Sequence, residues 1–183
     1  MQATDSVGGS HAVFDYGGAV ATAIVRFKYA GRSDLAERFS AIMAAASALA
    51  TPEVDLVVPV PLHPRRLVER GFDQAALLGA PIARRLGIAH APRALLRTRV
   101  TAPQASLDRD ARSANVANAF RCSTPRHVAG RRVLLVDDVR TTGATLSACA
   151  EALRAAGAAD VRSLVLATRN RLEKSTKLQV ARD

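Results

Sequence analysis

The stretch Val133–Thr145, VLLVDDVRTTGAT, decides how the rest of the chain is interpreted. Four apolar residues precede two aspartates, Asp137 and Asp138, and a threonine-rich segment with Gly143 follows. The apolar run is typical of a buried parallel strand, and the residues after Gly143 have the pattern of a helix. The acidic pair and the threonines therefore lie either in an ordinary polar turn, or in a site that binds a sugar and a phosphate side by side.

The segments around this stretch alternate between helical and strand patterns. Helices are expected over 21–31, 34–50, 73–86 and 143–157, and strands over 54–60, 131–138 and 160–168. Strands separated by helices predict βαβ units, and therefore an α/β fold with a mostly parallel sheet. At 183 residues, 49% of them hydrophobic, the chain is expected to form a single domain.

In an open parallel sheet, ligands bind beyond the carboxyl ends of the strands, which is where the acidic pair is expected. Free N–H groups at the start of the next helix suit a phosphate, and Gly143 would let the backbone approach it. Hydroxyl donors come from Thr141, Thr142 and Thr145. The carboxylates could accept hydrogen bonds from a cis-diol or help to hold Mg²⁺, so the stretch suits a ribose 5-phosphate.

Three other phosphate or acidic motifs do not fit. The chain has neither G-x-x-x-x-G-K-[ST] nor G-x-G-x-x-G at a strand-to-helix turn, which excludes a Walker loop and a Rossmann turn. VLLVDD also resembles the opening of a response-regulator receiver. A receiver domain carries its acidic pair near its start and most of its length follows the pair. Here only Val139–Asp183 follows, so the receiver interpretation fails.

The formal charge of +10 favours anionic ligands, either phosphates or nucleic acid, although a basic but merely solvated surface stays open. Only 4% of the residues are aromatic and none is tryptophan, which disfavours a stacking platform for bases. Cys122 and Cys149 form no C-x-x-C, and His63, His90 and His127 lack metal-ligand spacing, so no structural zinc and no disulfide is expected.

A reducing cytoplasm is the expected location. The N-terminus lacks a signal-peptide pattern, and the apolar run AIMAAASALA, residues 41–50, is too short to cross a membrane. No membrane association is therefore expected.

The chain resembles a known family through four motifs. VLLVDDVRTTGAT resembles the signature with which type I phosphoribosyltransferases bind 5-phosphoribosyl 1-pyrophosphate (PRPP). Three more segments stand in the order found in the ComF family of competence-associated phosphoribosyltransferase-like proteins, which includes ComFC and GntX. They are FKYAGRSDLA (27–36), VPVPLHPRRLVERGFDQAALL (58–78) and RTRVTAPQASLDRDARSANVANAF (97–120). The resemblance runs from about Tyr16 to Thr168.

The resemblance implies a type I phosphoribosyltransferase fold: a mostly parallel sheet flanked by helices, with a flexible hood over the reaction centre. The domain would span 13–169 and the hood about 97–121, between a flexible segment 1–12 and a polar tail 170–183. Two departures stand out. Relatives commonly carry an N-terminal cysteine-rich zinc ribbon, whereas no cysteine precedes Cys122, and Arg140 stands where an apolar residue is more usual.

The resemblance also implies residue roles. Asp137 and Asp138 would be catalytic, holding the ribose hydroxyls and orienting Mg²⁺ through the ligand. The 5-phosphate would be bound by Val139, Arg140, Thr141, Thr142, Gly143, Ala144 and Thr145. Pyrophosphate would be bound by Pro61, Leu62, Arg65 and Arg66, with Lys28, Arg32 and Arg70 as weaker candidates. The hood would contribute Arg97, Thr101, Gln104, Arg112 and Asn115.

Structural alternatives remain for each group: helix capping for the aspartates, a solvated basic loop around Arg65 and Arg66, and a non-catalytic excursion for the hood.

The implied reaction is displacement of pyrophosphate from C1 of PRPP by a nitrogen nucleophile, with orientation and charge stabilisation from the protein. The sequence does not reveal the acceptor base or the oligomeric state. The alternative is a non-enzymatic competence-associated protein that binds nucleic acid or a DNA-processing partner and keeps the PRPP pocket as a sensor.

Overall fold

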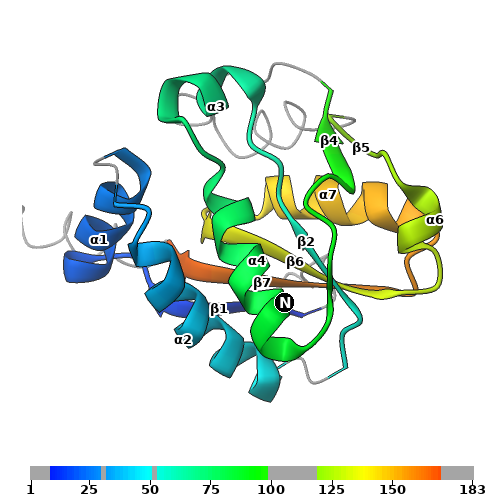
Figure 1. Ribbon diagram of the computed structural model, residues 1–183, viewed down its shortest axis with the longest axis horizontal. Helices are drawn as coiled ribbons and strands as arrows, with labels where there is room; N and C mark the ends of the chain where they lie inside the picture. The colour runs from blue at the N-terminus through cyan, green and yellow to red at the C-terminus, as the bar shows by residue number, and fades with distance from the viewer. Residues whose placement is uncertain (1–8, 30–31, 51–52, 99–118, 170–183) are drawn as a thin grey trace, which may run out of the picture.

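The computed structural model describes residues 9–29, 32–50, 53–98 and 119–169. Its centre is a five-stranded sheet in the order β1-β7-β6-β2-β3, with every neighbouring pair parallel (Figure 1). The strands are β1 (Ser10–Asp15), β2 (Leu56–Pro59), β3 (Ala89–His90), β6 (Arg132–Arg140) and β7 (Asp160–Thr168). The expected α/β fold with a mostly parallel sheet is confirmed.

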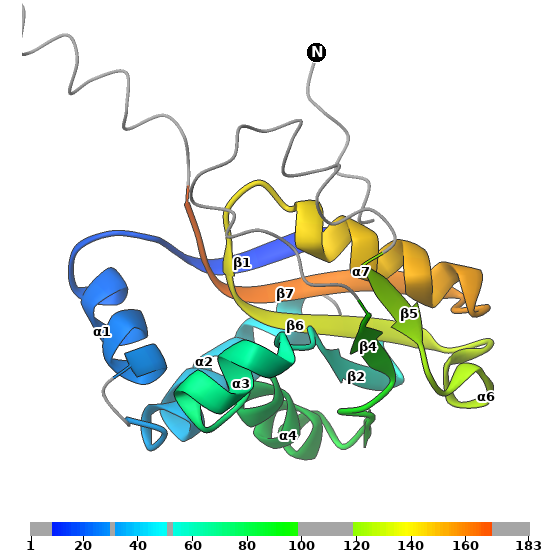
Figure 2. The same cartoon turned by 90° about the horizontal axis from the view of Figure 1, so that it is seen from above.

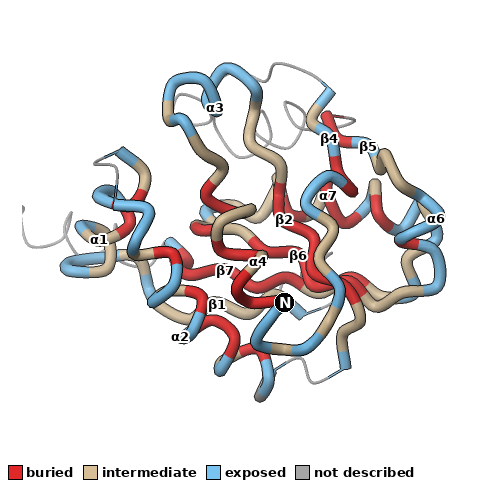
Figure 3. The backbone as a smooth tube through the Cα atoms, in the orientation of Figure 1, coloured by how far each residue is buried: buried red, intermediate tan, exposed pale blue. Residues whose placement is uncertain are grey.

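Helices cover both faces of the sheet (Figure 2). One face carries α1 (Gly18–Tyr29), α2 (Leu35–Ala50) and α4 (Gln74–Leu86), and the other carries α7 (Ala144–Ala155). Neighbouring residues of β6 alternate between two cores: Val133 and Leu135 pack on the α7 side, whereas Leu134 and Val136 pack with α1, α2 and α4. Burial on both faces explains why this strand reads as a continuous apolar run (Figure 3).

A small antiparallel pair stands beside the main sheet. It consists of β4 (Leu95–Arg97) and β5 (Phe120–Cys122), and α6 (Pro125–Val128) follows it. β5 packs close to α7 (Figure 2). The expected hood spans 97–121. Its two ends therefore lie in this two-stranded sheet, beside α7.

Three local features differ from the sequence expectation. Ser10–Asp15 forms an edge strand that the sequence did not reveal, so 10–12 lie in β1 although they belong to the segment expected to be flexible. The loop after β2 contains a short helix, α3 (Pro64–Arg70). β6 continues beyond the acidic pair to Arg140, because Arg140 still pairs with Thr168 of β7. The two strand features depend on pairing with β7, which is distant in the sequence, whereas α3 is capped locally by His63 and Gly71.

Cys122 and Cys149 are free thiols in the structure. Among the described helices, none combines the length and the apolar character that a membrane crossing requires.

Candidate active site

A cleft of about 290 Å³ lies at the carboxyl ends of four parallel strands. Tyr16 follows β1, Val60 to Leu62 follow β2, Asp137 and Asp138 lie in β6, and Arg169 follows β7. Parallel strands end at the same edge of a sheet, so these segments converge although they are far apart in the sequence.

Charged side chains dominate the lining of the cleft. Among the described residues, the basic lining residues are Lys28, Arg66, Arg70, Arg97 and Arg169, and the acidic ones are Asp73, Asp137 and Asp138. The basic residues outnumber the acidic ones, which suits a ligand with more than one anionic group.

The two aspartates face different surroundings because side chains alternate along a strand. Asp138 is 7% exposed, and its Oδ2 lies 2.8 Å from Nζ of Lys28, which α1 supplies. Asp137 lies on the α7 side of the sheet, near Cys149 of α7. Burial of the Cys149 thiol raises its pKa, and the nearby charge of Asp137 raises that pKa further. Oδ1 of Asp137 accepts the backbone N–H of Asp138 at 2.8 Å. Desolvation, and then the charge of Asp138, raise the pKa of Asp137 to about 8.

The segment after β6 forms a small second cavity, of about 40 Å³, that shares Asp137, Val139, Thr141 and Thr145 with the cleft. Its other lining residues are Arg140, Thr142, Gly143, Ala144 and Leu146. The cavity lies against the start of α7, where the first N–H groups of a helix favour an anion. We call residues 139–145 the phosphate loop.

Gly143 has a left-handed backbone with a φ of 81°. A Cβ at this position would meet only Cδ of Arg140, at 4.0 Å. Gly143 is therefore required by its backbone conformation, which L side chains rarely adopt, and not by crowding. Arg140 itself donates from Nε to Oγ1 of Thr168 at 3.3 Å.

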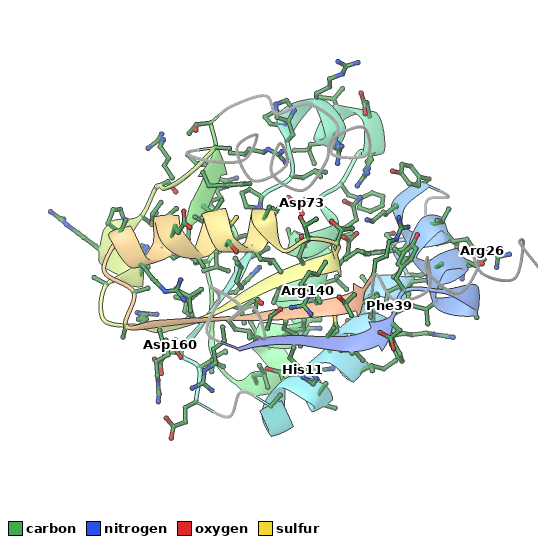
Figure 4. The ribbon with its side chains drawn as sticks, turned by 180° about the vertical axis from the view of Figure 1, so that it is seen from behind. His11, Arg26, Phe39, Asp73, Arg140 and Asp160 are labelled. Carbon is green, nitrogen blue, oxygen red and sulfur yellow. The ribbon has the colours of Figure 1, made fainter. Side chains whose placement is uncertain are left out.

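The segment that runs from the β2–α3 loop into α3 also lines the cleft. Pro61, Leu62 and Arg66 line the cleft, whereas Arg65 does not: it is 82% exposed and pairs with Glu69 at 3.0 Å. Asp73 ties this loop to α4, since its Oδ2 accepts the N–H of Leu62 at 3.0 Å and its Oδ1 accepts that of Ala76 at 3.1 Å (Figure 4).

Arg97 is the one expected hood residue that the structure describes. Its guanidinium lies 5.4 Å from the centre of the Phe120 ring, and the side chain lines the cleft. Burial, and then the charge of Arg66, lower the pKa of Arg97. The other expected hood residues lie outside the described residues: Thr101, Gln104, Arg112 and Asn115.

The weaker candidates have separate positions. Lys28 and Arg70 line the cleft, whereas Arg32 is an exposed residue that pairs with Asp34 at 2.8 Å. Arg70 donates to Oε1 of Gln74 and to the hydroxyl of Tyr29, each at 2.8 Å.

Four polar lining residues were missed by sequence reasoning, namely Tyr16, Asp73, Gln74 and Arg169, and so were the apolar Val60 and Ala75. Asp73 could have been recognised as a helix N-cap, because it immediately precedes the helical pattern. No sequence pattern marked Tyr16 or Arg169, because they meet only through the pairing of β1 with β7. The guanidinium of Arg169 lies 4.5 Å from the centre of the Tyr16 ring.

Magnesium can fit this site only together with ligand oxygens. In the part of the chain that the structure describes, no three histidine, cysteine or acidic side chains are arranged so that they could hold a metal ion by themselves. Mg²⁺ is commonly held by one or two carboxylates plus substrate phosphates, which Asp137 and Asp138 satisfy. Of the histidines, His63 accepts the N–H of Arg65 through Nδ1 at 3.1 Å and thereby caps α3.

The chain matches the family model described as "Phosphoribosyl transferase domain" over residues 73–179. It is 38% identical over 156 residues to DNA utilization protein YhgH of Escherichia coli K12, covering 81% of this chain and 67% of that protein. It is 36% identical over 108 residues to competence protein F of Haemophilus influenzae, covering 58% and 47%. It is 28% identical to competence protein ComFC of Bacillus subtilis, covering 86% and 63%.

A solved structure, glutamine phosphoribosylpyrophosphate amidotransferase from B. subtilis, has a similar fold. The TM-score is 0.52 at 23% identity, with 76% of this chain and 30% of that chain covered. The family match includes the acidic pair, the phosphate loop and α7, and the YhgH match extends over most of the chain. The chain therefore belongs to the phosphoribosyl transferase domain family and is a ComF-family protein with the phosphoribosyltransferase fold.

Proposed function

We propose that the cleft binds PRPP or a ribose 5-phosphate ligand, with Mg²⁺, and transfers the phosphoribosyl group to a nitrogen acceptor with release of pyrophosphate. One observation carries the proposal: the acidic pair lines one cleft together with basic residues and part of the phosphate loop, and Asp137 also lines the phosphate-loop cavity. A ribose that carries a phosphate at one end and a pyrophosphate at the other needs these three kinds of group close together.

Each end of the ligand has a suitable partner. The first N–H groups of α7 and the hydroxyls of Thr141, Thr142 and Thr145 would bind the 5-phosphate. Arg66 would bind the pyrophosphate through its guanidinium, and Pro61 and Leu62 would shape its place by lining the cleft. Asp137 and Asp138 would accept hydrogen bonds from the ribose hydroxyls.

The residues of the cleft would stabilise the transition state by position and charge. The carboxylates lie near the sugar as positive charge develops on it, and the arginines stabilise the departing pyrophosphate. No covalent nucleophile is needed. Mg²⁺, bound by the pyrophosphate of the ligand and oriented by the acidic pair through that ligand, would supply further charge neutralisation of the pyrophosphate.

The proposal is tested by calorimetry of PRPP and ribose 5-phosphate with the double variant Asp137→Asn/Asp138→Asn. Hydrogen bonds to charged groups contribute roughly 1.5–3 kcal/mol each, so binding should weaken at least about tenfold. Asp160→Asn is the matched control, because Asp160 lies at the opposite end of β7 (Figure 4). Unchanged affinity in the folded double variant would remove the assignment.

The second candidate function is binding of nucleic acid or of a DNA-processing partner, with the cleft acting as a sensor of PRPP. Two observations favour it: relatives are named for DNA utilization and competence, and the formal charge is +10. It differs from the first candidate in predicting strong salt dependence and no release of pyrophosphate.

A further inference from the structure

Lys28 brings a positive charge to the acidic pair from a distant part of the chain. It is the penultimate residue of α1, and α1 precedes residues 73–179, which match the family model. The Lys28 and Asp138 side chains are only 20% and 9% exposed, and Nζ lies 2.8 Å from Oδ2. Partial exclusion of water makes this ion pair stronger than one on an open surface.

The contacts of the two carboxylates leave part of the acidic pair for a ligand. Within the described residues, Oδ2 of Asp138 is engaged by Lys28 and Oδ1 of Asp137 by the N–H of Asp138. One oxygen of each carboxylate then remains, and two acceptors are what the two hydroxyls of a cis-diol require.

We propose that Lys28 is a positioning residue of the ribose subsite: it occupies the place of a divalent cation at Asp138, so that a sugar phosphate binds without a metal ion. This inference rests on the proposed function of the cleft. Lys28 makes the net charge of the acidic pair about one unit more positive, so without it the pair repels the phosphate of the ligand more strongly.

The simpler interpretation is an ordinary ion pair that fastens α1 to β6. Such a pair would change the stability of the fold when it is removed, but it would not change how ligand binding depends on metal. The two interpretations are therefore separated by measuring metal dependence, with stability as an independent readout.

In the first experiment, Mn²⁺ alone is titrated into the wild type, Lys28→Met, Lys28→Gln and Arg26→Met. Binding of Mn²⁺ is measured by electron paramagnetic resonance. Arg26 is the matched control, because it is an exposed cation on the same helix and does not line the cleft (Figure 4). Removing the ammonium should tighten Mn²⁺ binding at least about tenfold in both Lys28 variants and leave Arg26→Met unchanged. Equal Mn²⁺ affinity in all four proteins would overturn the inference.

The second experiment measures ribose 5-phosphate binding by calorimetry, in EDTA and in Mg²⁺. The wild type should bind equally in both, within about threefold, whereas Lys28→Met and Lys28→Gln should bind at least about tenfold more weakly in EDTA and recover in Mg²⁺. Lys28→Arg, which keeps the charge, should behave as the wild type.

The outcomes separate the inference from the function on which it rests. A wild type that binds ribose 5-phosphate only with Mg²⁺, or Lys28 variants without a metal requirement, would overturn the role of Lys28 alone. A wild type that binds ribose 5-phosphate in neither condition would overturn the proposed function and this inference with it. Circular dichroism identifies the folded variants, and either of the two uncharged substitutions suffices for the comparison.

Discussion

At the scale of single residues, alternation along β6 determines what each member of the acidic pair can do. Asp138 faces α1 and meets Lys28, whereas Asp137 lies on the side of α7. Adjacent carboxylates in one turn would share one environment. Here they reach the same cleft from opposite faces of the sheet, which gives one an ion pair and leaves the other with a pKa raised by burial.

Gly143 carries the first prediction at this scale. Replacing it with alanine should destabilise the protein by roughly 1–2 kcal/mol, because its φ of 81° is unfavourable for L residues. Urea denaturation measures the change. Gly17→Ala is the control, since Gly17 lacks a positive φ and a Cβ there would have open space. Equal effects of the two substitutions would contradict the conformational argument.

At the scale of elements, Asp73 joins the β2–α3 loop to the start of α4. Asp73→Ala should lower the free energy of unfolding by about 1 kcal/mol through loss of the helix cap, and should weaken pyrophosphate binding because Leu62 loses its carboxylate partner. Urea denaturation and calorimetry test the two effects separately. Asp73→Asn, which keeps one acceptor oxygen, should fall between alanine and the wild type; an alanine variant with unchanged stability and binding would refute this role.

Asp55 joins the starts of β2 and β6, and its ion pair gives a pH prediction. Arg132 donates to both Asp55 oxygens, at 2.8 and 3.0 Å, and this contact lowers the pKa of Asp55. Because the pKa of Asp55 is lower in the folded state than its ordinary value of 3.8, the ionised carboxylate stabilises the folded state at pH values above 3.8. This stabilisation is lost as the pH falls below 3.8. Asp55→Asn should therefore be less stable than the wild type at pH 7, and the difference should shrink towards pH 2.

Urea denaturation over pH 2–7 provides the measurement for Asp55. Asp34→Asn is the comparison, because Asp34 forms a similar exposed pair with Arg32, two residues away, that joins no elements. It should cost less stability at pH 7. A difference between wild type and Asp55→Asn that does not change with pH would show that the charge of Asp55 plays no part.

At the scale of the whole molecule, the formal charge of +10 separates the two candidate functions. Nucleic acid held by many Lys and Arg contacts should lose affinity steeply with salt, with log K falling linearly in log salt, whereas PRPP in the cleft should be less sensitive. We expect single-stranded DNA to use a face other than the cleft, because a ribose-phosphate site suits a terminal phosphate better than a continuous strand.

Filter binding of single-stranded DNA against increasing Mg²⁺–PRPP tests this expectation. Gly143→Val should abolish PRPP binding and leave DNA binding intact, because it distorts the phosphate loop alone. Competition between PRPP and DNA, or loss of both ligands in Gly143→Val, would place the strand in the cleft.

The sequence by itself determined the α/β class, the principal strands and helices, and the ligand chemistry expected at the acidic pair. These features are local: the strand expected over 131–138 is marked by the apolar run 133–136, α4 and α7 by their helical period, and the phosphate loop by adjacent residue types. The resemblance to the ComF family rested on four such local motifs in order, and the family match and the relatives confirmed it.

Only the tertiary structure decided which side chains share the cleft. Edge strand β1 has no strong pattern of its own and forms by pairing with β7, which places Tyr16 against Arg169. Lys28 reaches Asp138 across a separation of many residues, and α3 directs Arg66 to the cleft but Arg65 to solvent. Hydrophobic periodicity specifies which face of an element is buried, but not which distant element meets it, so these contacts could not be derived from the sequence.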